Sequence, residues 1–480
     1  MVLSAVTAFA QPNILFIISD DLNTKIGPYM DIDQHTPNLD RLAGEGVRFD
    51  RTYCQYPLCG PSRASLMSGL YTETNGVVGN SHVLGSYRAV TPSLNAHPSM
   101  AGFFREQGYF TARVSKIYHM GVPGGIERGD PGGDDPDSWD FATNIMGPET
   151  LSDGKLELLS PGNLHYGSNF SSMQLKDDRA STQTDYLATS QAIAILENRA
   201  AELPPNGTNK QKQKADAPFF LAVGLVRPHV PLIAPENCFA PYPEEQIILP
   251  EIDHSEDVPD AALRMQNHRI WQMSLAQQRK TIQAYMASIR FMDQQVGRLL
   301  DALNRLNLRE ETIIVFVSDH GYNLGEHDCW AKTSLWEGTV RVPMIISAPG
   351  YNQTKGTTNA SISELIDLYP TLIDLAGFSA YQPKILQGTS LLPAISQGDV
   401  MAKKAAYSIT QRGKAASIRT DRWRYTCWNQ EIPTTNEELY DHHQDPEELI
   451  NLVSDPNYQI KLNEMRALLA EMRKKAQAKI

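Results

Sequence analysis

The sequence predicts an α/β fold built on a mostly parallel sheet with helices on both faces. Residues 13–19 (NILFIIS) and 312–318 (TIIVFVS) are continuous apolar runs of strand length. Such runs are typical of strands that are buried on both faces of a parallel sheet. Helical patterns alternate with the strand patterns along the chain, as expected where helices connect parallel strands.

The remaining elements follow from local patterns in the same way. Further strands are expected over 109–114, 219–224 and 344–347. The longest helix is expected over 279–306, where apolar residues recur at steps of three and four and form one wide stripe. Shorter helices are expected over 188–196 and 363–376. Loops are expected over 121–137 and 203–217, which are rich in Gly, Pro and polar residues.

The pattern of strands and helices changes beyond residue 390, where we expect a smaller C-terminal α+β subdomain. Residues 417–428 (SIRTDRWRYTCW) favour one or two antiparallel strands. Residues 457–480 favour a terminal amphipathic helix that ends in Lys and Arg, as the helix dipole prefers. The expected division is a leader remnant over 1–10, a main domain over 11–390 and a subdomain over 391–480.

Composition and charge narrow the classes of function. The 480 residues are 41% hydrophobic and 20% charged, which is ordinary for a globular protein. A formal net charge of −12 argues against a general partner of nucleic acid or anionic membranes, because such proteins need a basic face. The five cysteines are too few for a disulfide scaffold, and the lack of a C-x-x-C pair argues against a thiolate zinc site.

The start of the chain, MVLSAVTAFAQPN, fits the end of a secretory signal with a cleavage site after Ala10. It fits an ordinary frayed N-terminus equally well, because a basic n-region is missing. No apolar run reaches membrane-spanning length. We therefore expect a soluble periplasmic or secreted protein without a membrane span.

Two of the predicted strands end in potential metal ligands. The first ends at Asp20-Asp21 and the second at Asp319-His320. Because ligands gather at the carboxyl ends of parallel strands, we expect these side chains to meet there. Three carboxylates and an imidazole suit a hard divalent cation. Each pair alone fits a helix cap or turn, and their joint occurrence at strand ends favours the metal.

The stretch 58–69 (LCGPSRASLMSG) predicts a helix start beside an unusual cysteine. Pro61 fits the first turn, so Cys59 and Gly60 are expected just before the helix with free N–H groups. This position stabilises an anion and lowers the pKa of a thiol, and Arg63 lies one turn along. A cysteine that simply packs in the core is an equally good interpretation of the spacing.

Four other basic or imidazole side chains follow predicted strands. The segments SKIYHMG, RPHVP and DCWAKTSLWEG place them there, and they are Lys116, His119, His229 and Lys332. Any one of them alone is typical of a surface or core residue. Together with Arg63 they predict an anion-binding pocket beside a divalent cation.

At this point the sequence resembles the type I sulfatases. Residues 59–63 match their C-x-P-S-R signature, whose cysteine a maturation enzyme oxidises to Cα-formylglycine. Further similar blocks are TPNLDRLAGEGVRF (36–49), SDHGYNLGEH (318–327) and ELYDHHQDPEELINL (438–452), so the resemblance spans about residues 12–455. The spacing of Lys116 and His119, the block FFLAVGLVRPHVP and the strand SIRTDRWRYTCW most resemble iduronate-2-sulfatases.

The resemblance implies an alkaline-phosphatase-like fold, one bound Ca²⁺ and a formylglycine at position 59. The metal ligands that it implies are Asp20, Asp21, Asp319, His320 and the modified Cys59. It also implies that Arg63 and Lys116 hold the formylglycine and the sulfate, and that Lys332 and His229 contact the sulfate. His229 is then the candidate acid for the leaving alcohol, and His119 accepts the proton whose loss expels sulfate.

The resemblance implies a sulfated saccharide as substrate. The secretion-like start favours an exo-acting enzyme, and the acidic net charge favours short oligosaccharides over long chains. One departure concerns the sugar, because Leu70-Tyr71 stand where iduronate-2-sulfatases carry an Arg-Arg pair for the substrate carboxylate. The candidate replacements for that pair are Arg88, Arg341, Trp330 and Trp336.

Two other functions remain open on the sequence. The first is a phosphodiester or phosphonate monoester hydrolase of the same superfamily, which can share the formylglycine signature. The second is an inactive, calcium-dependent protein that binds sulfated glycans. The second alternative predicts an unmodified Cys59 and no turnover, although every expected catalytic position is occupied.

Overall fold

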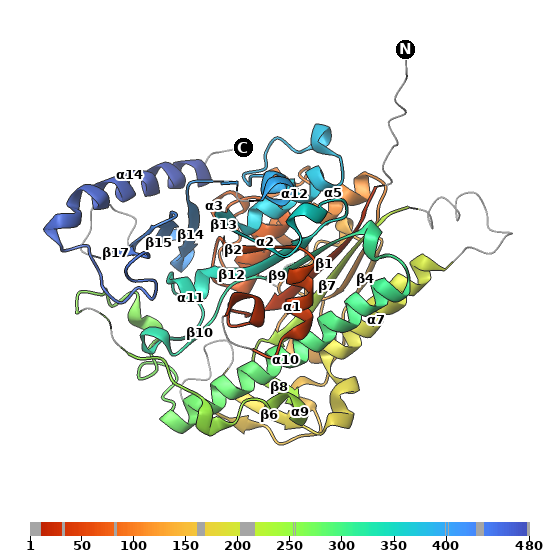
Figure 1. The fold of residues 1–480 in the computed structure, drawn as a ribbon, viewed down its shortest axis with the longest axis horizontal. Helices are drawn as coiled ribbons and strands as arrows, with labels where there is room; N and C mark the ends of the chain where they lie inside the picture. The colour runs from red at the N-terminus through yellow and green to blue at the C-terminus, as the bar shows by residue number, and fades with distance from the viewer. Residues whose placement is uncertain are drawn as a thin grey trace, which may run out of the picture.

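The computed structural model describes residues 11–30, 34–80, 84–160, 169–201, 217–252, 254, 256–398, 400–401, 403–428 and 436–477. Its centre is an eight-stranded sheet (Figure 1). The strands are β1 (Asn13–Asp20), β2 (Val47–Tyr53), β3 (Phe110–Ser115), β4 (Phe141–Thr143), β7 (Phe219–Pro228), β9 (Thr312–Ser318), β12 (Arg341–Ser347) and β13 (Thr357–Glu364). Their order across the sheet is β13-β2-β12-β9-β1-β7-β3-β4.

The sheet is mostly parallel, as predicted. β1 pairs in parallel with both β7 and β9, whereas β12 runs antiparallel to its neighbours β9 and β2. The central strands are buried along almost their whole length, which explains their continuous apolar sequences. The patterns did not predict β2 and β13, because β2 carries Arg48, Asp50 and Arg51 and β13 is rich in Thr, Asn and Ser.

Helices cover both faces of the sheet. Figure 1 shows α1 (Pro37–Gly44), α7 (Thr184–Ala200) and α10 (Leu275–Arg305) on one side, and α2 (Cys59–Ser68), α5 (Met100–Glu106) and α12 (Leu368–Leu375) on the other. The shorter helices are α3 (Thr72–Asn75), α4 (Ser86–Val90), α6 (Gly124–Arg128), α9 (Glu236–Phe239), α11 (Glu337–Val340) and α13 (Leu392–Gln397). The short strands are β5 (Glu157–Leu158), β6 (Ser171–Leu175), β8 (Leu232–Pro235), β10 (Asn323–Leu324) and β11 (Trp330–Ala331).

Two predicted elements differ from the structure. The helix expected over 363–376 begins only at Leu368, because Ser363 and Glu364 still belong to β13. The buried Glu364 accepts hydrogen bonds from Tyr71 Oη (2.9 Å) and from the backbone N–H of Tyr407 (2.9 Å). The loop expected over 121–137 contains the short helix α6. The loop expected over 203–217 lies outside the described residues except for Ala217.

The C-terminal part contains the predicted separate antiparallel sheet. It consists of β14 (Ala406–Thr410), β15 (Ala415–Arg419), β16 (Trp423–Cys427) and β17 (Glu437–Asp441), and α14 (Gln459–Ala476) lies along it (Figure 1). Buried ion pairs join the C-terminal part to the rest of the protein. Arg424 of β16 binds Glu337 of α11 as well as Glu448, and Lys403, which precedes β14, lies 2.5 Å from Glu364 of β13.

The described helices include none that is both long enough and apolar enough to span a membrane. The leader expected over residues 1–10 lies outside the described residues.

Candidate active site

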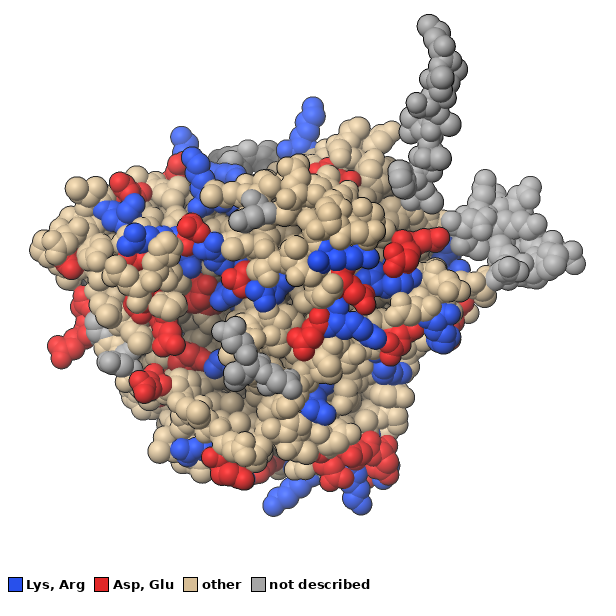
Figure 2. Space-filling view, viewed as in Figure 1, with Lys and Arg blue, Asp and Glu red and all other residues tan. Residues whose placement is uncertain are grey.

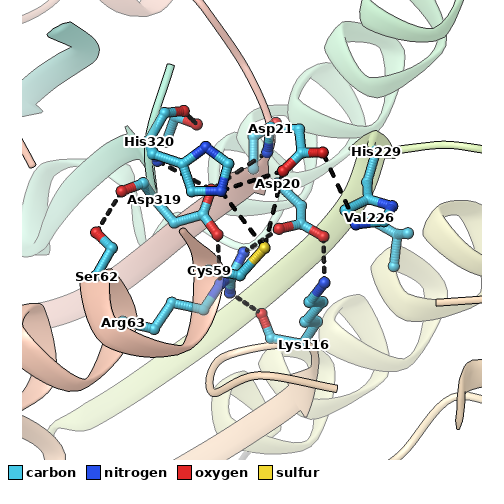
Figure 3. A network of polar contacts seen from close by, with 12 residues as sticks. Asp20, Asp21, Cys59, Ser62, Arg63, Lys116, Val226, His229, Asp319 and His320 are labelled. Carbon is cyan, nitrogen blue, oxygen red and sulfur yellow. Dashed lines mark hydrogen bonds and ion pairs between the residues drawn. The ribbon is translucent and has the colours of Figure 1, made fainter. Parts of the chain in front are cut away.

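The carboxyl ends of β1 and β9 bring the predicted metal ligands together. The two strands are parallel neighbours, and Ser19 is in register with Ser318, so Asp20 and Asp319 leave the sheet side by side. Figure 3 shows the side chains of Asp20, Asp21, Asp319 and His320 converging around the sulfur of Cys59. The sequence prediction that these two strand ends meet is therefore confirmed by the geometry.

Hydrogen bonds hold the two strand ends together. The backbone N–H of Asp21 donates to Asp319 Oδ1 (3.2 Å), and that of Leu22 donates to Ser318 Oγ (3.0 Å). Ser318 Oγ in turn donates to the carbonyl of His320 (2.8 Å). Asp21 has a φ of +64°, a conformation that costs free energy for a non-glycine residue and needs such support.

Tyr285 from the middle of α10 supplies further support to this turn. Its hydroxyl donates to the carbonyl of Asp21 (2.7 Å) and accepts from the backbone N–H of Asn23 (2.9 Å). The ring is buried and stacks on Tyr322 with centroids 5.5 Å apart. The long helix therefore fixes the left-handed turn that aims the Asp21 carboxylate.

The residues fit a divalent cation. Asp20, Asp21 and Asp319 are buried, and each places a carboxylate oxygen within 4.8 Å of the others. Asp21 Oδ2 is buried and accepts no hydrogen bond from any residue that the structure describes. A buried carboxylate oxygen without a donor is costly unless a cation binds it, so the site has the ligand chemistry of a hard metal ion.

His320 is oriented as a ligand by its backbone neighbour. Its Nδ1 lies 2.8 Å from the carbonyl of Gly321, which assigns the Nδ1–H as the donor. Nε2 then faces Asp21 Oδ1 at 3.2 Å and Cys59 Sγ at 3.4 Å. Burial would lower the pKa of His320, but Asp319 and Cys59 outweigh it and raise that pKa to about 9.

Cys59 is the first residue of α2, so the prediction that it precedes the helix is wrong. Pro61 is the third helical residue, because the extended Leu58 already serves as the N-cap. The N–H of Gly60 is also not free, since it donates to Asn80 Oδ1 (2.9 Å). A Cβ at position 60 would lie 2.9 Å from the carbonyl oxygen of Gly79, which explains the glycine there.

Cations surround the Cys59 thiol. Lys332 Nζ lies 3.3 Å from Sγ and 2.6 Å from Asp21 Oδ1. Burial and the charge of Asp20 would raise the pKa of the thiol, but Lys332 and Lys116 outweigh them and lower it to about 7. The predicted electropositive setting of the cysteine thus comes from side chains rather than from free N–H groups of the helix.

Arg63 and Lys116 bind the carboxylates. Arg63 Nε donates to Asp319 Oδ2 (2.8 Å) and Nη2 to Asp20 Oδ1 (3.1 Å), while Nη1 donates to the carbonyl of Lys116 (2.5 Å). Lys116 Nζ makes a close ion pair with Asp20. Burial would raise the pKa of Asp20, yet Lys116 and the other nearby cations hold it well below 3.8. Arg63 therefore holds the carboxylates of Asp20 and Asp319 in place.

The two predicted histidines occupy different positions. His229 Nδ1 lies 2.6 Å from the carbonyl of Val230, and its Nε2 faces Asp21 Oδ2 at 3.7 Å. His119 is buried in the loop after β3 and lines a small cavity together with Gly60. His119 therefore shares this cavity with Gly60, the residue that follows Cys59.

Comparison with known proteins decides the family. A family description named "Sulfatase" matches residues 12–378, and one named "N-sulphoglucosamine sulphohydrolase, C-terminal" matches residues 325–475. A sulfatase of Formosa agariphila is 32% identical over 473 residues, covering 96% of this chain and 86% of the relative. The chain belongs to the sulfatase family. It is therefore a hydrolase of sulfate esters, as the sequence predicted.

Two further comparisons locate this sulfatase among its relatives. Human iduronate 2-sulfatase is 32% identical over 404 residues, covering 76% of this chain and 69% of the human protein. The structure of a phosphonate monoester hydrolase of Agrobacterium radiobacter matches with a TM-score of 0.72 at 21% identity, covering 97% and 96% of the two chains. The second match shows the shared fold and nothing further.

The position of the missing Arg-Arg pair is buried in this sulfatase. Leu70 packs in a small apolar cluster with Ala64 and Val77, and the Tyr71 hydroxyl donates to Glu364. The candidate substitutes bind other groups. Arg88 contacts His97 and Asp135, Arg341 contacts Asp50, Trp330 packs on Phe170, and Trp336 stacks on His327 and donates to Glu438.

Sequence reasoning missed three supporting residues. Ser62 Oγ donates to the carbonyl of Asp319, Ser318 joins the two ligand turns, and Tyr285 holds Asp21. Ser318 stands directly before Asp319, and this position was an available signal. Tyr285 belongs to the apolar stripe of α10, so no sequence pattern distinguished it from a core residue.

Proposed function

We propose that this sulfatase removes sulfate from a sulfated carbohydrate by means of a formylglycine hydrate at position 59, beside Ca²⁺. The observation that carries the proposal is the placement of Cys59 Sγ within 3.3–3.8 Å of Lys332, His320 and Asp21. A nucleophile formed there is within reach of both the cations and the metal ligands. The carbohydrate class is supported by the name of the human relative, iduronate 2-sulfatase.

The hydrate explains why an aldehyde is needed at position 59. One hydroxyl, whose proton passes to Asp319, attacks sulfur, and the S–O bond to the sugar breaks as the sugar oxygen leaves and takes up a proton. The second hydroxyl then loses its proton, for which His119 is the candidate base, and the C–O bond to the sulfate breaks. Sulfate departs and the aldehyde forms again, so the enzyme can turn over repeatedly.

The cation ligands of the proposal are Asp20, Asp21, Asp319, His320 and the modified residue 59. When bound there, Ca²⁺ would stabilise negative charge on the sulfuryl oxygens and on the nucleophile. Lys332 and His229 have side chains that are 17% and 8% exposed, whereas those of Arg63, Lys116 and His320 are fully buried. They lie where an incoming sulfate ester first meets the site, and His229 Nε2 is positioned to protonate the leaving sugar oxygen.

Further parts of the proposal concern the protein as a whole. We assign the catalytic domain to residues 11–390 and the subdomain to 391–480. A formylglycine-generating enzyme is the expected maturation partner, and the periplasm or the secreted fraction is the expected location. The exo mode on oligosaccharides agrees with the burial of most of the site and with the net charge of −12, which repels long polyanions.

A substrate panel tests the function. Sulfate release is measured on 2-O-sulfated uronates, 3-O-sulfated rhamnose, carrageenan oligomers and an aryl sulfate, with a phosphodiester and a phosphonate monoester assayed by their own products. We expect kcat/KM for one sulfated saccharide to exceed that for the phosphonate by at least about 100-fold, which is about 2.7 kcal/mol of transition-state binding. A preference for the phosphonate would instead support the superfamily alternative, and turnover of the aryl sulfate alone would refute the carbohydrate assignment.

Replacing Tyr285 by phenylalanine tests the support of the Asp21 turn. The variant loses the hydrogen bonds to the carbonyl of Asp21 and the N–H of Asn23, so the left-handed turn loosens. We expect Ca²⁺ affinity, measured by calorimetry, to fall about tenfold, as is usual when an outer-shell partner of a metal site is removed.

The matched control is Tyr369→Phe. Tyr369 is equally buried, and its hydroxyl also donates to backbone carbonyls, those of Pro98 (3.0 Å) and Ser99 (3.1 Å), but it does not contact the site. It should lose similar stability and keep its Ca²⁺ affinity. Equal Ca²⁺ affinities in Tyr285→Phe and the unsubstituted protein would contradict the role of Tyr285.

A further inference from the structure

We propose that the unconverted form of this protein, in which residue 59 is still a cysteine, contains a zinc site. Its ligands are Cys59 Sγ, His320 Nε2 and Asp21 Oδ1, with water in the fourth position. The inference goes beyond the proposed function, because it concerns the protein before the thiol is oxidised and does not require any turnover.

The distances between the three ligand atoms match a tetrahedral zinc ion. Sγ lies 3.4 Å from His320 Nε2 and 3.8 Å from Asp21 Oδ1, and Nε2 lies 3.2 Å from Asp21 Oδ1. Zinc bonds of about 2.0–2.3 Å at tetrahedral angles place ligand atoms about 3.3–3.6 Å apart. All three side chains are buried, so little reorganisation is needed to receive the ion.

The orientation of each ligand also suits zinc. The carbonyl of Gly321 holds the Nδ1–H of His320, so the Nε2 atom faces the thiol (Figure 3) and can coordinate a metal that displaces its proton. Asp21 Oδ2 is buried and accepts no hydrogen bond from a residue that the structure describes, so this carboxylate has coordination capacity to spare. These observations distinguish the cluster from a packed cysteine beside a charged pair.

Chemistry selects zinc over calcium for this set of atoms. The thiolate decides between the two ions, because a thiolate is a ligand for Zn²⁺, whereas Ca²⁺ prefers oxygen ligands such as the hydroxyls of the aldehyde hydrate. This site uses only one thiolate, so it needs no C-x-x-C pair. The sequence pattern therefore showed no sign of a zinc site. Since the zinc site shares Asp21 and His320 with the proposed Ca²⁺ site, the two ions exclude each other, and conversion of Cys59 to an aldehyde removes the zinc ligand altogether.

Local charge permits a divalent ion. With His320 neutral, as a zinc ligand must be, the carboxylates of Asp20, Asp21 and Asp319 and the thiolate carry four negative charges, against three positive charges on Arg63, Lys116 and Lys332. Lys332 is the direct competitor, because its Nζ lies 2.6 Å from Asp21 Oδ1 and 3.3 Å from Sγ. It is also the most exposed of the three cations, so its long side chain can move towards solvent when the ion binds.

The experiment uses the full chain expressed without a maturation enzyme, with the thiol at position 59 verified by mass spectrometry. Co²⁺ is titrated first, because a cobalt–thiolate bond gives a charge-transfer absorption band that carboxylate and imidazole ligands do not give. We expect one equivalent of Co²⁺ to produce the band and Zn²⁺ to abolish it. Lys332→Met should bind Zn²⁺ at least about tenfold more tightly, because it removes the competing ammonium group.

Two variants make the assignment specific. Cys59→Ser should lose the band, whereas Cys329→Ser, which alters another fully buried cysteine, should keep it. His320→Gln should weaken Co²⁺ binding at least tenfold while Cys59 remains, which covers the case in which Cys59→Ser does not fold. Absence of the band in the unsubstituted protein, or the same band in Cys59→Ser, would overturn the proposal. An inactive converted enzyme would count against the proposed function and leave this result unaffected.

Discussion

Replacing Cys59 by serine is expected to abolish multiple turnover of sulfate esters, with a loss of at least about 10⁴-fold in kcat, as for other catalytic nucleophiles. A serine hydroxyl can still attack the sulfur atom of the sulfate ester, because it occupies the same position as Cys59 Sγ. Lys332 Nζ and His320 Nε2 lie 3.3 and 3.4 Å from Sγ. However, serine is not oxidised to the aldehyde, so a sulfated serine has no second hydroxyl to expel the sulfate.

The distinctive result is a single turnover. We expect Cys59→Ser to release up to one equivalent of the sugar alcohol and to retain the sulfate as an ester, which mass spectrometry of the intact protein detects. Cys329→Ser serves as the control, since Cys329 is also fully buried but lies in the hairpin segment between β10 and β11. Full multiple-turnover activity of Cys59→Ser would show that residue 59 is not the nucleophile.

Much of the site could be predicted from the sequence because its ligands stand at the ends of buried strands. The apolar runs predict β1 and β9, and a parallel pairing in register necessarily brings Asp20 beside Asp319. The end of an apolar run is a sharp local signal. The same reasoning does not predict β2 and β13, because their polar residues break the apolar pattern. These segments form strands because β2 pairs with β12 on one side and with β13 on the other.

The partners within the site could not be predicted from the same patterns. Spacing placed Arg63 one turn from Cys59, but only the structure shows that its guanidinium binds Asp20 and Asp319. The charge of the whole cluster decides this arrangement, because three buried carboxylates demand cations nearby. Gly224 is a second example. A Cβ there would lie 2.1 Å from the carbonyl oxygen of Lys116, a close approach between β7 and the loop after β3 that no local pattern indicates.

Replacing Arg63 by methionine is expected to have the second-largest effect, on stability as well as on activity. The change removes a fully buried guanidinium from two carboxylates and from the carbonyls of Lys116 and Ile117. Breaking a buried ion pair by removing one partner costs about 3–5 kcal/mol, because the remaining charge stays buried without compensation. Urea unfolding of the metal-free protein should show a loss of this size.

A matched variant separates stability from function. Arg424→Met also removes a fully buried arginine from two carboxylates, those of Glu337 and Glu448, at the C-terminal sheet. Both variants should lose similar stability. Only Arg63→Met should also change Ca²⁺ affinity and lose at least about 100-fold in kcat/KM, about 2.7 kcal/mol, when assayed well below its unfolding temperature.

Arg63→Lys shows which property of the arginine matters. An ammonium group restores the charge, but it cannot bind Asp20, Asp319 and two carbonyls at once, as the planar fork of Arg63 does through Nε, Nη1 and Nη2. We therefore expect Arg63→Lys to recover much of the stability while kcat/KM stays low. Recovery of activity together with stability would mean that Arg63 supplies charge alone, and that the alignment of the two carboxylates does not depend on its geometry.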